Sequence, residues 1–99
     1  MRQVLPRRRA AETFDLRFWN QLFTVTVGFY PDGTPAEVFV DIAKSGADIA
    51  GIARDVGVVI SLALVEIETL RHAVTRDARG GAASLVGAVV DALIVRGAA

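Results

Sequence analysis

The first half of the chain alternates between hydrophobic and polar residues. Three runs, at about residues 13–18, 22–29 and 36–42, show the two-residue period of strands with one buried face. Asn20 and Gln21 mark the first turn, and Pro31-Asp32-Gly33-Thr34 marks the second. Short turns between neighbouring strands predict an antiparallel meander. The positions predicted to face the core are Phe14, Leu16, Phe18, Phe23, Val25, Val27, Phe29, Ala36, Val38, Val40 and Ile42.

A helical period replaces this alternation after residue 46. Asp48 is a candidate N-cap, because its carboxylate can accept hydrogen bonds from the free N–H groups of a first turn. Apolar residues then recur at helical spacing, and over residues 56–65 the opposite face is apolar as well. A helix that is apolar on every side is expected to be buried on every side.

Two glycines interrupt this helix, each at a cost of about 1 kcal/mol relative to alanine. We therefore expect a backbone or another helix to approach closely at Gly51 and Gly57. Residues 66–77 continue in helical register with no glycine or proline before them. The sequence leaves two alternatives open over residues 48–76: one long helix, or two helices joined by a tight bend.

A break at residues 77–81 separates this region from a final helix. Ser84 is a candidate N-cap for that helix, and Gly97 is a candidate terminator. Strands followed by helices predict an α+β fold, a three-stranded antiparallel meander followed by two or three helices packed on one face. We expect a flexible basic arm over residues 1–11 and a single domain over residues 12–97.

Composition narrows the chemistry further. The 99 residues are 53% hydrophobic and 22% charged, as in one globular domain, and they include no cysteine. Thiolate nucleophiles, disulfides and thiyl radicals are therefore excluded for this chain. With His72 as the single histidine, a His-rich metal site is excluded too, and we expect no cofactor. The apolar run is too short to span a membrane, and the first residues lack a signal-peptide core, so we expect a cytoplasmic protein.

Charge is unevenly distributed along the chain. The 11 basic and 11 acidic residues cancel, yet the first ten residues hold four arginines and no acid. The other 89 residues therefore carry 7 basic and 11 acidic groups, a net charge of −4. An acidic body repels phosphate backbones, so we do not expect nucleic acid as a partner. Whether the arginines at 7–9 bind anything is left open.

A cluster of basic residues offers a candidate ligand site. His72 and Arg76 lie four residues apart on one helix face, and Arg79 follows in a loop. Together they could hold a phosphate, next to a helix N-terminus where free N–H groups favour anions. A solvated helix end and ordinary salt bridges are the simpler interpretation. The candidate ligand-binding residues are Arg54, Asp55, His72, Arg76, Arg79 and Ser84.

Several stretches, taken together, resemble a known family. The matching residues are 24–40, 43–48, 53–55, 60–64, 70–77 and 83–91, including the Pro31-Asp32-Gly33-Thr34 turn. In order and spacing they are similar to the TSCPD domain, found near the C-terminus of adenosylcobalamin-dependent ribonucleotide reductases and as small stand-alone bacterial proteins. The likeness spans about residues 5–95. The Thr-Ser-Cys-Pro-Asp string that names the family is absent, and the linker between the two middle helices is shorter.

The resemblance implies a link to ribonucleoside-diphosphate reductase and deoxyribonucleotide metabolism. Reduction of a ribonucleotide needs a thiyl radical and a redox-active cysteine pair, whereas the only sulfur here belongs to Met1. We therefore expect a non-catalytic accessory or interaction domain, with a ribonucleotide reductase subunit as a candidate partner. The alternative is a small nucleotide- or anion-binding protein that uses the basic cluster.

Self-association is also expected. Three strands leave two open sheet edges, and one sheet cannot cover a helix that is apolar all round. Trp19, beside a turn, is typical of an interface anchor. We expect a homodimer with Trp19, Val58 and Leu62 in its interface. The alternative is a compact monomer in which the last helix completes the burial.

Overall fold

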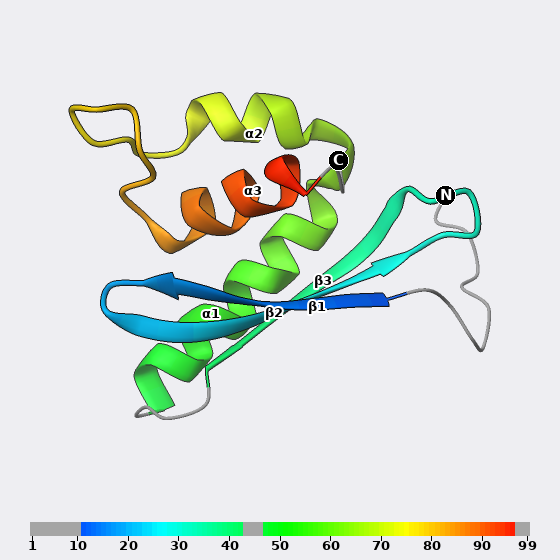
Figure 1. Ribbon diagram of the computed structural model, residues 1–99, viewed down its shortest axis with the longest axis horizontal. Coiled ribbons are helices and arrows are strands. Elements are labelled where there is room, and N and C mark those ends of the chain that lie inside the picture. Colours follow the sequence, from blue (N-terminus) through cyan, green and yellow to red (C-terminus); the bar gives the residue numbers. More distant parts are fainter. Residues whose placement is uncertain (1–10, 43–46, 97–99) are drawn as a thin grey trace.

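The computed structural model describes residues 11–42 and 47–96. Three strands precede the helices. Helices α2 and α3 lie on one side of the sheet, and α1 runs along its far edge in this view (Figure 1). This confirms the α+β fold expected from the sequence. The elements are β1 (Ala11–Phe18), β2 (Gln21–Phe29), β3 (Pro35–Ile42), α1 (Ala47–Leu62), the short 3₁₀ turn η1 (Leu64–Glu66), α2 (Ile67–Ala73) and α3 (Leu85–Val95).

The sheet is the predicted antiparallel meander, in the order β1-β2-β3. Its first turn lies one residue earlier than expected, because Gln21 already pairs with Phe18. Trp19 and Asn20 form the turn with φ of 53° and 59°, the positive values of a two-residue type I′ turn. The second turn is as predicted, with the Asp32 carboxylate accepting hydrogen bonds from the Thr34 backbone N–H (2.9 Å) and hydroxyl (2.7 Å).

The core lies between the inner face of the sheet and the helices. Strand residues of alternating positions meet one face of α1 and the apolar face of α3, so the two-residue and helical periods converge on the same interior. The buried hydrophobic residues are Phe14, Phe23, Val25, Val27, Ala36, Val38, Val40, Ala53, Val56, Ile60, Ile67, Leu85, Ala88, Val89, Val90 and Leu93.

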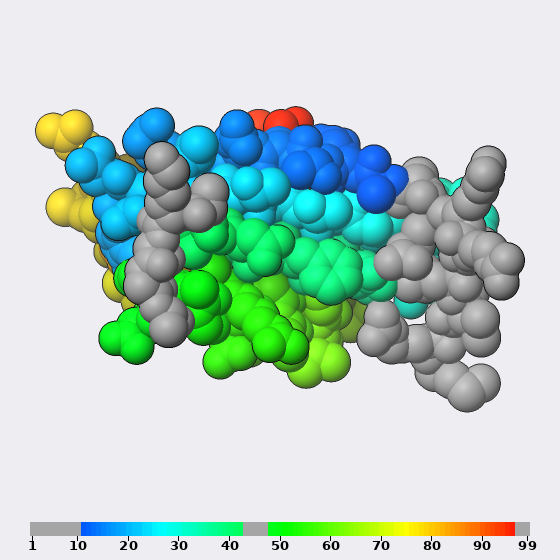
Figure 2. All heavy atoms as spheres, turned by 90° about the horizontal axis from the view of Figure 1, so that it is seen from below, coloured from blue at the N-terminus to red at the C-terminus, as the bar shows by residue number. Residues whose placement is uncertain are grey.

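Helix α1 lies against the outer edge of β3. Seen from below, β1, β2, β3 and α1 follow one another in that order across the molecule (Figure 2). A Cβ added to Gly57 would lie 3.0 Å from the Val38 carbonyl oxygen, so the predicted close approach occurs here. A Cβ at Gly51 would meet nothing within 4 Å, so the same prediction is wrong for Gly51 within the described chain.

A serine side chain also joins α1 to β3. The Ser61 hydroxyl accepts a hydrogen bond from the Val38 N–H at 2.8 Å, and it lies within donor range of the Val38 carbonyl (3.0 Å) and the Gly57 carbonyl (2.8 Å). The backbone of an edge strand would otherwise present these groups to water or to another chain. Ser61 therefore helps α1 to cover one of the two edges that the sequence leaves open.

The open question about residues 48–76 is resolved in favour of two helices. Helix α1 ends at Leu62, and η1 leads into α2 at Ile67. In a straight helix Ile67 would lie about 10 Å along the axis from the buried Ile60. The bend instead returns Ile67 to the core, where it is 6% exposed.

Two expectations about α1 need correction. The helix begins at Ala47, so Asp48 lies in its first turn instead of capping it. Its outer face is not buried within the chain, since Val58 is 52% and Leu62 75% exposed. The reason is geometric, because β3 and α3 reach only one side of the helix. The proposed arm at residues 1–11, apart from Ala11 in β1, and the terminator Gly97 lie outside the described residues.

Candidate functional site

The connection between α2 and α3 is a tight, hydrogen-bonded loop. Asp77 Oδ1 accepts from the backbone N–H groups of Arg79 (2.9 Å) and Gly81 (2.8 Å), while Gly80 supplies a φ of 84°. An antiparallel bridge between Arg76 and Ala82 closes the loop. The loop thereby fixes where the Arg76 side chain leaves the backbone.

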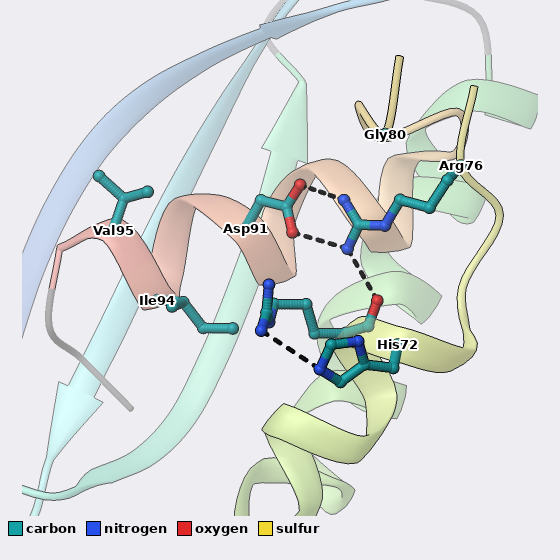
Figure 3. Close-up of a pocket in the computed structure, with 7 residues that line it drawn as sticks. His72, Arg76, Gly80, Asp91, Ile94 and Val95 are labelled. Atoms are coloured by element: carbon teal, nitrogen blue, oxygen red, sulfur yellow. Dashed lines mark hydrogen bonds and ion pairs between the residues drawn. The ribbon is translucent and has the colours of Figure 1, made fainter. Parts of the chain in front are cut away.

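Arg76 binds Asp91 of α3 through both of its terminal nitrogens. Its Nη2 lies 2.8 Å from Asp91 Oδ1 and 2.8 Å from the Arg71 carbonyl oxygen, and its Nη1 donates to Asp91 Oδ2 (Figure 3). This two-pronged contact matches the planar geometry of guanidinium and carboxylate. The hydrogen bond from Arg76 holds the pKa of Asp91 below its ordinary value of 3.8, and the same bond raises the pKa of Arg76. The pair thus locks the end of α2 to α3.

A pocket of about 440 Å³ opens beside this pair. The Arg71 Nη2 lies 3.1 Å from Glu68 Oε1 and 3.2 Å from His72 Nε2. An Arg N–H can donate to that ring nitrogen only when the nitrogen carries no proton. The pocket is lined by Arg71, His72, Arg76, Gly80, Asp91, Ile94 and Val95 (Figure 3).

The structure separates the six residues proposed as one ligand site. His72 and Arg76 share the pocket, but Asp91 already neutralises Arg76. Ser84 is the N-cap of α3, as predicted, with its hydroxyl accepting from the Gly87 N–H at 3.2 Å. Arg79 is held through its backbone in the Asp77 turn.

Arg54 and Asp55 lie elsewhere, on the exposed face of α1. Among the described residues, the carboxylate partner of Arg71 is Glu68 and that of Arg76 is Asp91, not Asp55. Arg54 instead contributes to a second hollow, between the edge of β3 and α1, with a volume of about 560 Å³. This groove, called the β3–α1 groove below, is lined by Glu37, Val38, Phe39, Val40, Asp41, Arg54, Val58, Ser61 and Leu62.

Two members of the pocket, Asp91 and Arg71, are not among the site residues predicted from the sequence. A signal for Asp91 existed, because it is the only charged residue within α3. A lone acid on an apolar helix needs a cation nearby, but the sequence offers several arginines and does not say which one folds against it. Ser61 also stands out in the sequence, because it is one of two residues that interrupt the apolar run at 56–65. A polar residue at such a position needs a hydrogen-bond partner, which the structure provides in β3.

The described residues show two further absences. No group of three or more His, Asp or Glu side chains in ranges 11–42 and 47–96 is placed to hold a metal ion. Across the same ranges, every helix is too short or too polar to cross a bilayer.

One characterised protein offers a comparison. The chain is 36% identical, over 63 residues, to a vitamin B12-dependent ribonucleotide reductase of Rhodopirellula baltica. The match covers 64% of this chain but only 6% of that reductase. No protein-family model matches the chain. No solved structure is similar to it.

Proposed function

We propose that this chain is a non-catalytic accessory domain of the TSCPD type that works with a vitamin B12-dependent ribonucleotide reductase in deoxyribonucleotide synthesis. The observation that carries the proposal is the 36% identity over 63 residues to such a reductase. The matched stretch is a small part of that long polypeptide, so most of the reductase lies outside it. A domain of this kind contributes binding or positioning to a larger enzyme.

The composition of the chain supports a non-catalytic role. Ribonucleotide reduction proceeds through sulfur chemistry, and the chain has no cysteine. Its polar pocket holds a neutralised Arg76–Asp91 pair with no sulfur nucleophile beside it.

We assign the contact with the reductase to the β3–α1 groove. Phe39, Val58 and Leu62 expose apolar surface there, next to the charged Arg54 and Asp41. A mixed surface of this kind, with an apolar centre and a charged rim, is typical of protein interfaces. The partner we propose is a reductase polypeptide without the stretch that this chain matches. In the Rhodopirellula baltica protein, that stretch and the rest of the reductase belong to one chain.

Binding in trans tests this proposal. The Rhodopirellula baltica reductase is prepared without its matched stretch and mixed with this chain, and association is followed by sedimentation velocity. We expect a complex with micromolar or tighter affinity, within the range that interfaces of standard size show. Leu62→Lys should weaken the complex at least about tenfold, because the ammonium would be buried without a partner.

Thr69→Lys serves as the matched control, since Thr69 is exposed on α2, outside the β3–α1 groove. It should leave the affinity unchanged. Absence of any complex at 100 µM of both proteins, a concentration about 100 times above a micromolar dissociation constant, would contradict the proposal. Equal loss with Thr69→Lys and Leu62→Lys would refute the assignment to the groove.

A second candidate is binding of a small anion or nucleotide in the pocket between α2 and α3. The observation in its favour is that Arg71 and His72 line the pocket together with Arg76. Calorimetric titration with a ribonucleoside diphosphate decides between the two functions. Micromolar binding that Arg71→Ala abolishes supports this candidate, and no binding supports the first.

A further inference from the structure

Within residues 11–42 and 47–96, the outer edge of β1 is a sheet edge that no other strand pairs with. In a two-residue hairpin the residues flanking the turn exchange both backbone hydrogen bonds, so Phe18 bonds inward to Gln21. Every second residue back from Phe18 also bonds to β2 through its backbone. The N–H and C=O groups of the residues between them point outward, away from β2. On β1 those outward-pointing residues are Ala11, Thr13, Asp15 and Arg17.

The two edge strands of the sheet, β1 and β3, differ in whether another element covers them. At β3, helix α1 covers the edge and Ser61 binds the outward N–H of Val38. At β1, no strand among the described residues pairs with the outer side, and β1 forms the margin of the sheet opposite α1 (Figure 2). Two charged side chains on the outer face of this strand are also unengaged, since neither Asp15 nor Arg17 has an ion-pair partner in the described part of the chain.

We propose that a second copy of this chain pairs with the β1 edge, strand against strand, about a two-fold axis at Leu16. The two sheets then form one continuous antiparallel sheet. This is a proposal about self-association and does not depend on the proposed function.

The backbone and the charges together select the register. Outward-pointing groups must meet outward-pointing groups, which limits the two-fold axis to a few positions along β1. An axis at Asp15 opposes two aspartates, and an axis at Arg17 opposes two arginines. With the axis at Leu16, Asp15 lies opposite Arg17 of the partner subunit, and Arg17 opposite the partner's Asp15. An axis at Phe14 sets no acid opposite a base.

The same register matches the inner face. Leu16 then lies opposite the partner's Leu16, and Phe14 opposite the partner's Phe18. Leu16 and Phe18 are only half-buried in the single chain, although they pack against the core. Pairing of two copies removes further apolar surface from water at these positions, which favours association.

Trp19 gives independent support. It is 51% exposed and has a φ of 53°, an unfavourable conformation for a bulky side chain. Such strain is often kept where a residue has a role. The register places Trp19 beside Thr13 of the partner subunit, at the end of the paired strands. The end of α3 shows beyond the β1 margin (Figure 2). Val95, near that end, is exposed and adds apolar surface.

Charge exchange tests the register directly. Light scattering on a sizing column should give a mass near twice 10.5 kDa for the natural chain. Asp15→Arg and Arg17→Asp should each weaken the dimer at least about tenfold, since each places like charges opposite one another twice. The double variant Asp15→Arg/Arg17→Asp should restore the dimer. Circular dichroism checks that each variant is folded.

Cysteine cross-linking supplies a second readout in a chain that has no natural cysteine. Leu16→Cys should form an intermolecular disulfide on oxidation, because the two residues meet at the axis in a non-hydrogen-bonded pair. Asp15→Cys should not, since its two copies are offset along the strands. The register would be overturned if the Asp15→Cys variant formed the disulfide and the Leu16→Cys variant did not.

The sequence alone placed Val58 and Leu62 in the dimer interface, whereas the β1 pairing leaves both outside it. Val58→Lys therefore distinguishes the β1 edge from the exposed face of α1. We expect it to leave the mass unchanged. If Val58→Lys dissociates the dimer while Asp15→Arg and Arg17→Asp leave it intact, the interface lies on α1 and the proposal is overturned. A chain that is monomeric at 100 µM, about 100 times a micromolar dissociation constant, would overturn it as well.

Discussion

Gly57 and Ser61 are the two residues that interrupt the apolar run at 56–65, and both face the backbone of β3. Gly57 lets the helix approach to the point where a methyl group would touch the strand. Ser61, one turn later, binds the strand's amide. Neither residue contributes apolar burial, yet together they set the distance and the position of α1 along β3.

Replacing the two glycines of α1 with alanine should have opposite effects. At Gly57 the new Cβ would lie 3.0 Å from Val38 O and 3.1 Å from Val40 N, atoms of a backbone that cannot move aside. We expect Gly57→Ala to destabilise the fold by about 1–3 kcal/mol, as overpacking does. Gly51→Ala meets open space and should stabilise it by about 0.4–1 kcal/mol. Urea unfolding measures both, and equal effects at the two positions would contradict the close approach.

At the scale of elements, the covered edge of β3 depends on one hydroxyl. Ser61→Ala removes the acceptor for the Val38 N–H and leaves a partly buried backbone group without its partner. The expected loss is about 1–3 kcal/mol in the free energy of unfolding. Thr69→Ala, an exposed substitution on α2, serves as the control and should change stability by less than about 0.5 kcal/mol. Hydrogen exchange at the Val38 amide should quicken in Ser61→Ala alone.

The link between α2 and α3 makes stability depend on acid. The hydrogen bond from Arg76 lowers the pKa of Asp91 below 3.8 in the folded chain. The stability that the ionised Asp91 contributes is therefore fully present above about pH 4. This contribution is lost as the pH falls through the lowered pKa of Asp91. Asp91→Asn should therefore unfold at lower urea than the natural chain at pH 7, and the difference should narrow below pH 4. A difference that is constant from pH 7 to pH 3 would rule out this origin, and Asp55→Asn provides an exposed control.

The strands could be predicted because their burial repeats every second residue, and one face of this sheet is buried. The bend after Leu62 could not, because no glycine or proline marks it and one helix or two would keep the same apolar face. The proposed grouping of Arg54 with His72 failed for another reason. Helical spacing places residues on a face, but only the packing of α1 against β3 decides that this face points away from α2.

At the scale of the whole molecule, the chain should carry out no ribonucleotide reduction by itself. Its 99 residues include no thiol that could form a radical or deliver electrons. Purified protein supplied with adenosylcobalamin, a dithiol and a ribonucleotide should yield no deoxyribonucleotide above the protein-free background. Turnover that co-purifies with the folded chain and persists after removal of any contaminating reductase would contradict this expectation.

One ion pair has a consequence for how such a domain is used. The Arg96 Nη1 lies 2.9 Å from Glu12 Oε1, across 84 positions of sequence, and the Arg96 guanidinium carbon lies 3.9 Å from the centre of the Phe14 ring. The first and last described elements are therefore held side by side. A unit whose entry and exit points coincide can be spliced into a longer polypeptide, or released from one, without rearranging the host. The ion pair between Glu12 and Arg96 gives the described residues this geometry.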